Sequence, residues 1–172
     1  NMINPDKYRN FGFRQAFYSH FVECGVNCFD MGVLGKDQYT ALKQWLADAG
    51  MLTVERKETA GKITEKVKKE ITPLANKLIS KGAYDPFPWA IMWANLSYNS
   101  IITNFFCLNI NAGEAFDKDF IIDSMGTDID KKYRSQAVNS LLSTFRDSPI
   151  GPSLKQGKKQ EKGYLREGWD YP

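Results

Sequence analysis

Hydrophobic and polar residues alternate along most of this chain with the period of an α-helix. Between Tyr8 and Cys24, apolar or weakly polar side chains recur every three or four residues, which predicts an amphipathic helix with one buried face. The members of this stripe are Phe13, Ala16, Phe17, His20, Phe21 and Cys24. The same spacing continues from Lys36 to Ala49, and Gly50 follows as the residue that ends this second helix, since glycine tolerates positive φ.

The segment after Gly50 changes character. Met51–Val54 alternates like a short strand. The next residues fit two structures: Ile63, Val67 and Ile71 have helical spacing, while the run ETAGK at 58–62 equally fits the tip of a hairpin whose return strand ends near residue 72. The pattern alone leaves both open.

A helix is predicted after this segment, because Thr72 is a good N-cap and Pro73 suits the first helical position. Gly82 ends it. A helix, a charged connecting element and a helix opened by Thr-Pro follow one another as the parts of a winged-helix domain do. We therefore predict a winged-helix-like unit over residues 1–82.

The second half predicts further helices. One begins at Pro88, another restarts near Ser100, and a short one is capped by Asp117. Asp128 or Asp130 opens a longer helix. Its predicted inward residues are Tyr133, Ala137, Val138, Leu141, Leu142 and Phe145.

A short helix, a glycine-containing turn and a longer helix resemble a helix-turn-helix pair, which we assign to residues 83–150. Residues 151–172 are rich in Pro, Gly, Lys and Gln and are predicted to form a surface tail, with Leu165, Trp169 and Tyr171 docking on the body or on a neighbouring domain. The predicted fold is mainly α, with winged-helix or helix-turn-helix-like units and at most a short β-hairpin. The whole chain is also short enough to form one compact domain.

Composition narrows the function classes only a little. The net charge of +3, from 23 Lys and Arg against 20 Asp and Glu, permits an anionic partner without requiring one. Three cysteines fit reduced thiols in the cytoplasm, and the first ten residues contain no apolar signal sequence. The apolar stretch from Phe87 to Ile110 is interrupted by asparagines, so we expect it to form core and not to span a membrane.

One group of residues has the chemistry of a metal site. His20, Cys24 and Cys28 are spaced by four, but zinc takes four ligands, and buried thiols with a hydrogen-bonded core histidine explain the pattern equally. His20 beside Cys24 also offers a nucleophile and a base, although no orienting acid or oxyanion hole is apparent. We therefore expect no catalytic residues and no cofactor in this chain.

Two helix faces have the composition of nucleic-acid interfaces, where cations contact phosphates and amides reach base edges. The first face carries Lys36, Lys43 and Gln44, and the second carries Lys132, Gln136, Asn139 and Arg146. The connecting element adds Arg56, Lys57, Lys62, Lys66, Lys68 and Lys69. Glutamates interleave with these cations, which is also typical of a solvated surface with internal charge pairs.

Several blocks of the chain resemble a known family. They are YRNFGFRQAF at 8–17, LGKDQYTALKQWLADAGML at 34–52, WAIMWANLSYNS at 89–100, AVNSLLSTFRDSPIG at 137–151, and the Trp and Pro of the final REGWDYP. They are similar to the C-terminal helical region of long phosphoadenosine phosphosulfate (PAPS) reductase-like proteins. In that family a reductase domain and a ferredoxin-type iron–sulfur segment precede the helical region, and a related module of unknown function accompanies DNA-phosphorothioation genes in bacteria.

The family's chemical motifs do not occur here. The chain has neither an SGGxDS-like pyrophosphate loop nor the CxxCxxC spacing of an iron–sulfur cluster. After PIG the family usually continues with Gly-Leu-Gly, whereas this sequence reads GPSLKQGKK. The resemblance therefore implies oxidoreductase or sulfur-transfer chemistry for a parent protein, but places it on no residue of this chain.

Together these observations lead to two hypotheses. In the first, the chain is a non-catalytic accessory domain of a PAPS-reductase-like protein and binds nucleic acid. In the second, it is a protein-docking module that packs on the reductase and iron–sulfur domains of that parent.

Overall fold

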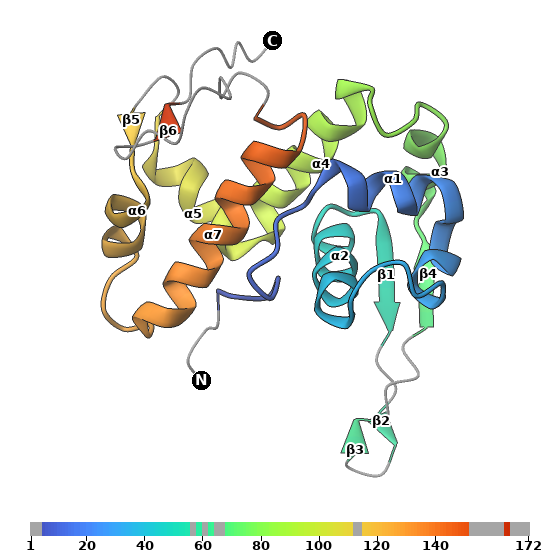
Figure 1. The fold of residues 1–172 in the computed structure, drawn as a ribbon, viewed down its shortest axis with the longest axis horizontal. Coiled ribbons are helices and arrows are strands. Elements are labelled where there is room, and N and C mark those ends of the chain that lie inside the picture. Colours follow the sequence, from blue (N-terminus) through green and yellow to red (C-terminus); the bar gives the residue numbers. More distant parts are fainter. Residues whose placement is uncertain are drawn as a thin grey trace.

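The computed structural model describes residues 5–55, 58–59, 62–63, 68–111, 115–151 and 164–165, and these are mainly helical, as predicted (Figure 1). The helices are α1 (Gln15–Cys24), the 3₁₀ helix η1 (Gly25–Asp30), α2 (Lys36–Asp48), α3 (Pro73–Ile79), α4 (Pro86–Asn99), α5 (Ile101–Asn109), α6 (Lys118–Ser124) and α7 (Lys131–Asp147). The strands are β1 (Leu52–Glu55), β2 (Glu58–Thr59), β3 (Lys62–Ile63), β4 (Lys68–Ile71), β5 (Ala115–Phe116) and β6 (Tyr164–Leu165).

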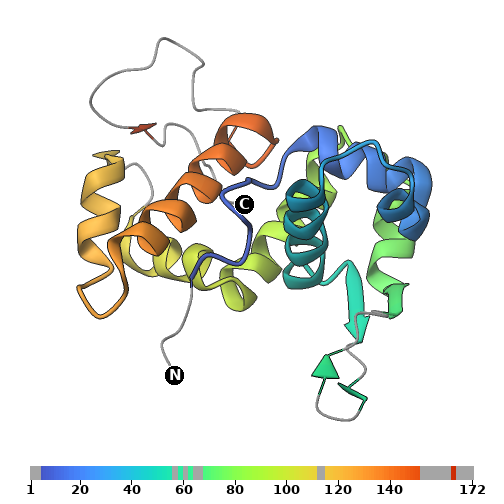
Figure 2. The same ribbon diagram turned by 60° about the horizontal axis from the view of Figure 1, so that its bottom comes forward.

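The segment after α2 is a β-hairpin, which decides between the two structures that the pattern allowed. β1 pairs antiparallel with β4, with Leu52 opposite Ile71 and Glu55 opposite Lys68. β2 pairs with β3 farther out, so the hairpin projects from the helical body (Figures 1 and 2). α1, η1, α2 and this hairpin follow in the order helix, turn, helix, hairpin.

The chain reverses between α2 and β1 at Gly50, whose φ of +76° favours glycine. The last carbonyls of α2 are satisfied by side chains from other elements. Asn99 donates to the carbonyl of Asp48 at 3.0 Å, and Asn95 donates to that of Ala49 at 2.9 Å. Two asparagines one turn apart on α4 therefore cap α2 and fix its direction.

The first helix is shorter than predicted. α1 begins at Gln15, because Arg9 and Asn10 have φ of 50° and 66°, which no α-helix contains. Phe13 is fully buried as predicted, but from an extended segment, and Ala16 is exposed. Residues 5–14 form a strap that runs between α2 and α7 (Figures 1 and 2).

Helix caps in the second half fall close to the predicted positions. Ser100 caps α5, Asp117 caps α6, and of the two alternatives for α7 it is Asp130 that caps it. α4 begins two residues earlier than predicted, since Asp85 accepts a hydrogen bond from the backbone N–H of Phe87 at 2.8 Å. Pro88 is tolerated in the first turn because N–H groups there have no helical partner.

The inward face of α7 differs from the prediction at its start. Tyr133 is 41% exposed, whereas its neighbour Arg134 is buried. The Arg134 guanidinium donates to the carbonyl of Ile122 on α6 and, at 2.9 Å, to that of Ile129. Arg134 therefore occupies the inward position that the hydrophobic pattern predicted for Tyr133, because its N–H groups satisfy free carbonyls at the end of α6.

The buried hydrophobic residues form one cluster that includes members from Tyr8 to Ile150, on both sides of the predicted boundary at residue 82. In the predicted tail, Tyr164–Leu165 pairs antiparallel with Ala115–Phe116. Trp169 and Tyr171 lie outside the described residues.

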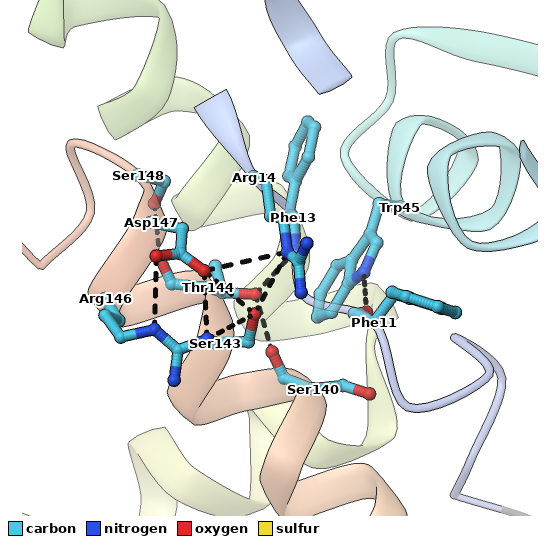
Figure 3. A network of polar contacts seen from close by, with 10 residues as sticks. All are labelled: Phe11, Phe13, Arg14, Trp45, Ser140, Ser143, Thr144, Arg146, Asp147 and Ser148. Carbon is cyan, nitrogen blue, oxygen red and sulfur yellow. Dashed lines mark hydrogen bonds and ion pairs between the residues drawn. The ribbon is translucent and has the colours of Figure 1, made fainter. Parts of the chain in front are cut away.

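The strap joins the two sides of this cluster through backbone and side-chain contacts (Figure 3). On one side, the Trp45 indole N–H donates to the carbonyl of Phe11 at 2.9 Å. On the other, the N–H of Phe13 donates to Thr144 Oγ1 at 2.8 Å. Between them, Gly12 lies directly on α7, where an added Cβ would come within 2.4 Å of the Thr144 backbone nitrogen.

This close approach predicts a large effect of one methyl group. Gly12→Ala should lower the free energy of unfolding by about 3 kcal/mol, because the strap must move away from the α7 backbone. Gly35→Ala is the control, since its Cβ would make only an ordinary contact with Gln38 at 3.5 Å. Urea unfolding followed by circular dichroism measures both, and equal stabilities for the two variants would contradict the assigned packing.

Candidate nucleic-acid interface

The first predicted face lies on α2. Residues of α2 that face the core include Leu42 and Trp45, both fully buried. Lys36, Lys43 and Gln44 lie on the opposite side of the helix by its period, with Lys36 exposed and the other two partly exposed. The amide of Gln44 donates to Asp48 Oδ1 at 3.0 Å, so it is engaged within the helix.

The start of α2 and the outer part of the hairpin lie on the same side of the molecule. β1 runs back along α2 after the reversal at Gly50, so its end at Glu55 is directed toward the end of α2 that carries Lys36. Figure 1 shows β2 and β3 continuing in that direction, beyond the helical body. β2 and β3 therefore lie on the side of the molecule where α2 begins.

The described hairpin residues place two of the predicted cations. Lys68 is opposite Glu55 in the backbone register of β1 and β4. The Lys69 ammonium lies 5.0 Å from the centre of the Phe29 ring on η1, which fixes the hairpin base against the turn before α2. Arg56, Lys57 and Lys66, and the side chains of Lys62 and Lys68, lie outside the described residues.

The second predicted face, on α7, divides into two parts. Lys132 is exposed and Gln136 is partly exposed near the start of the helix. Farther along, Asn139 donates to Asn10 Oδ1 at 3.0 Å, so this amide holds the strap.

Arg146 is also engaged within the chain (Figure 3). Its guanidinium donates to both carboxylate oxygens of Asp147, at 3.1 and 3.0 Å. Asp147 in turn lies 3.6 Å from Arg14 of the strap, and Ser143 links the two arginines. The polar residues of this half of α7 thus bind the protein's own N-terminal segment, which competes with a role in contacting a partner.

The sequence-predicted metal candidates have structural partners. The Nε2 atom of His20 lies 3.3 Å from both the Cys28 carbonyl and the Tyr39 hydroxyl. Cys28 is buried, and burial raises the pKa of its thiol to about 12. Within the described residues, no group of three or more His, Cys, Asp and Glu is placed to hold a metal ion.

One polar pair escaped the sequence reasoning. Tyr8 is buried, its ring stacks on Trp45 with 3.5 Å between centres, and its hydroxyl donates to Asp48 Oδ2 at 2.6 Å. Burial raises the pKa of the Asp48 carboxyl, although the hydrogen bonds from Tyr8 and Gln44 oppose this. One feature of the sequence pointed to this pair: Asp48 lies at the edge of the apolar stripe of a helix that also carries Trp45.

No helix in the described part of the chain is both long and apolar enough to cross a membrane. Searches with this chain found no matching protein-family model, no matching curated protein and no matching solved structure.

The raised pKa of Asp48 predicts a pH-dependent effect. Because the folded state favours the protonated carboxyl, the ionised form destabilises the fold increasingly as pH rises from its unfolded pKa, near 4, through the folded value. Asp48→Asn keeps an oxygen that can accept from Tyr8 but carries no charge. Its stability relative to the unsubstituted protein should therefore be higher at pH 7.5 than at pH 4, measured by urea unfolding. A difference that is the same at both pH values would contradict the desolvation assigned to Asp48.

Proposed function

We propose that this chain is a nucleic-acid-binding module that uses the start of α2 together with the hairpin, in the manner of a winged-helix domain. The observation that carries the proposal is the order α1, η1, α2, hairpin, with the start of α2 and the hairpin extension on one side of the body (Figure 1). In such an arrangement a helix enters a groove of the duplex while the hairpin follows the phosphate backbone.

Charge supports this choice of surface. Residues 56–69 contain six Lys and Arg against two Glu, and α2 adds Lys36 and Lys43. The α7 face is the weaker of the two surfaces, because Asn139 and Arg146 already make contacts within the chain. The proposal therefore rests on α2 and the hairpin.

The resemblance to PAPS-reductase-like proteins extends the proposal. We place this module in a larger cytoplasmic protein, where it acts as an accessory domain without catalytic residues or a cofactor of its own. Its role would then be to hold reductase and iron–sulfur domains near a nucleic acid.

Duplex binding and its salt dependence test the proposal. In fluorescence anisotropy with a labelled DNA duplex, log K should fall linearly with log salt as phosphates are neutralised. Lys36→Ala with Lys43→Ala should weaken binding and reduce the magnitude of that slope by about 2, since each lost phosphate contact contributes about 0.9.

Lys132→Ala is the matched control, because this exposed lysine lies on α7. It should leave both the affinity and the slope unchanged. An α2 double variant that binds as the unsubstituted protein does would remove α2 from the interface. A loss confined to Lys132→Ala would assign binding to α7.

Protein docking is a second candidate, favoured by the surface of α4 and α5. Residues 86–113 include no Asp, Glu, Lys, Arg or His, and within this stretch Tyr98 is 85% exposed and Leu108 is 77% exposed. Exposed apolar side chains on uncharged helices are typical of surfaces that bind other proteins.

This second candidate predicts that separately expressed reductase and iron–sulfur domains of a parent protein co-elute with this chain at micromolar concentration. Tyr98→Ser with Leu108→Ser should abolish co-elution, whereas Lys132→Ala should not. Independent elution of the unsubstituted chain and those domains would contradict docking.

A further inference from the structure

Two aromatic side chains are exposed where the chain passes from the loop after α3 into the first turn of α4. Tyr84 is 76% exposed and Phe87 is 53% exposed. Lys81 lies beside Phe87, with its ammonium 5.7 Å from the centre of the ring, and Lys77 is exposed one turn earlier on α3. We call Lys81, Tyr84 and Phe87 the aromatic platform.

The backbone that carries the platform is held firmly by the core. The carbonyl of Ala83 accepts hydrogen bonds from the indole N–H of buried Trp89 at 2.9 Å and from Gln15 of α1 at 3.2 Å. Ala83 itself is buried, and Asp85, two residues later, is the N-cap of α4. The rings of Tyr84 and Phe87 therefore project outward from a fixed support, which lowers the entropy lost when a ligand binds them.

The chemistry of the platform matches that of unpaired nucleotides. Bases stack on exposed aromatic rings whatever their sequence, and neighbouring lysines neutralise the phosphates between them. Asp85, the acid nearest in sequence, has one carboxylate oxygen occupied by the α4 cap. The loop between α3 and α4 lies on the side of the molecule away from β2 and β3, so the platform is separate from the α2 surface (Figure 1).

We propose that the aromatic platform is a second nucleic-acid contact that binds single-stranded DNA or RNA by base stacking. This goes beyond the duplex binding assigned to α2 and the hairpin, and it does not depend on it. Lys81 and Lys77 hold the phosphates while Tyr84 and Phe87 take the bases.

Anisotropy of a labelled single-stranded oligothymidine with the full chain tests this site. Tyr84→Ala with Phe87→Ala should weaken oligothymidine binding about ten-fold or more, while leaving duplex affinity unchanged. Phe120→Ala is the control, because Phe120 on α6 is 51% exposed, close to the 53% of Phe87, and should not affect binding.

A second variant keeps the test independent of folding. Lys81→Gln preserves the rings and should reduce the salt slope of oligothymidine binding by about 0.7, the value for one phosphate contact on a single strand.

Failure of the unsubstituted chain to bind oligothymidine would overturn the proposal, as would equal affinities for the Tyr84/Phe87 and Phe120 variants. Loss of co-elution with a protein domain on the Tyr84/Phe87 substitutions, with oligothymidine binding intact, would assign the platform to a protein partner and would also overturn it. None of these results affects the α2 proposal, which is measured on duplex DNA.

Discussion

Trp45 is the residue through which the two sides of this fold are joined. Its ring is stacked on Tyr8, lies nearly parallel to Phe13, and its indole N–H donates to the carbonyl of Phe11, so the strap is held on α2 by three separate contacts. The same strap then binds α7 through Phe13 and Arg14. Aromatic side chains of this size contribute several kcal/mol each when buried. The relative placement of α2 and α7 therefore depends on ten residues that belong to neither helix.

This arrangement has a consequence for binding. The strap occupies the C-terminal half of the polar face of α7, whereas the start of α2 faces outward with the hairpin beside it. On α7 the strap contacts the polar side of the helix through Asn139, whereas on α2 it lies against the side that carries Trp45. The internal packing of the chain thus distinguishes the polar face of α2 from that of α7, although the two are similar in composition.

The strands β2 and β3 and the loop between α3 and α4 lie on opposite sides of the molecule (Figure 1). Both the hairpin and the platform are held by contacts at their base. Lys69 on the Phe29 ring anchors the hairpin, and the carbonyl of Ala83, bound by Trp89, anchors the platform. Side chains on supports that are fixed in this way lose less entropy when a partner binds. Lys36 on α2 and Tyr84 and Phe87 of the platform are exposed, so substitutions can test the two proposed contacts separately.

Local chemistry in the sequence determined the helices and most of their ends. Thr72, Ser100 and Asp117 cap helices at the predicted positions because a side-chain oxygen can satisfy a free N–H without help from distant residues. Gly50 ends α2 for an equally local reason.

The features that depend on residues far apart in the sequence were decided only by the tertiary structure. The helix predicted from Tyr8 begins at Gln15 because the strap turns at Arg9 and Asn10, where φ is positive, and Trp45, far along the chain, binds the carbonyl of Phe11. Arg134 is buried in place of Tyr133 because carbonyls of α6 and of the loop before α7 need its donors. The segment after α2 is a hairpin because β4 packs beside η1, where Lys69 reaches Phe29. The spacing of hydrophobic residues indicates which side of a helix is buried. It does not indicate which distant partner a polar group will bind, and that partner decided each of these positions.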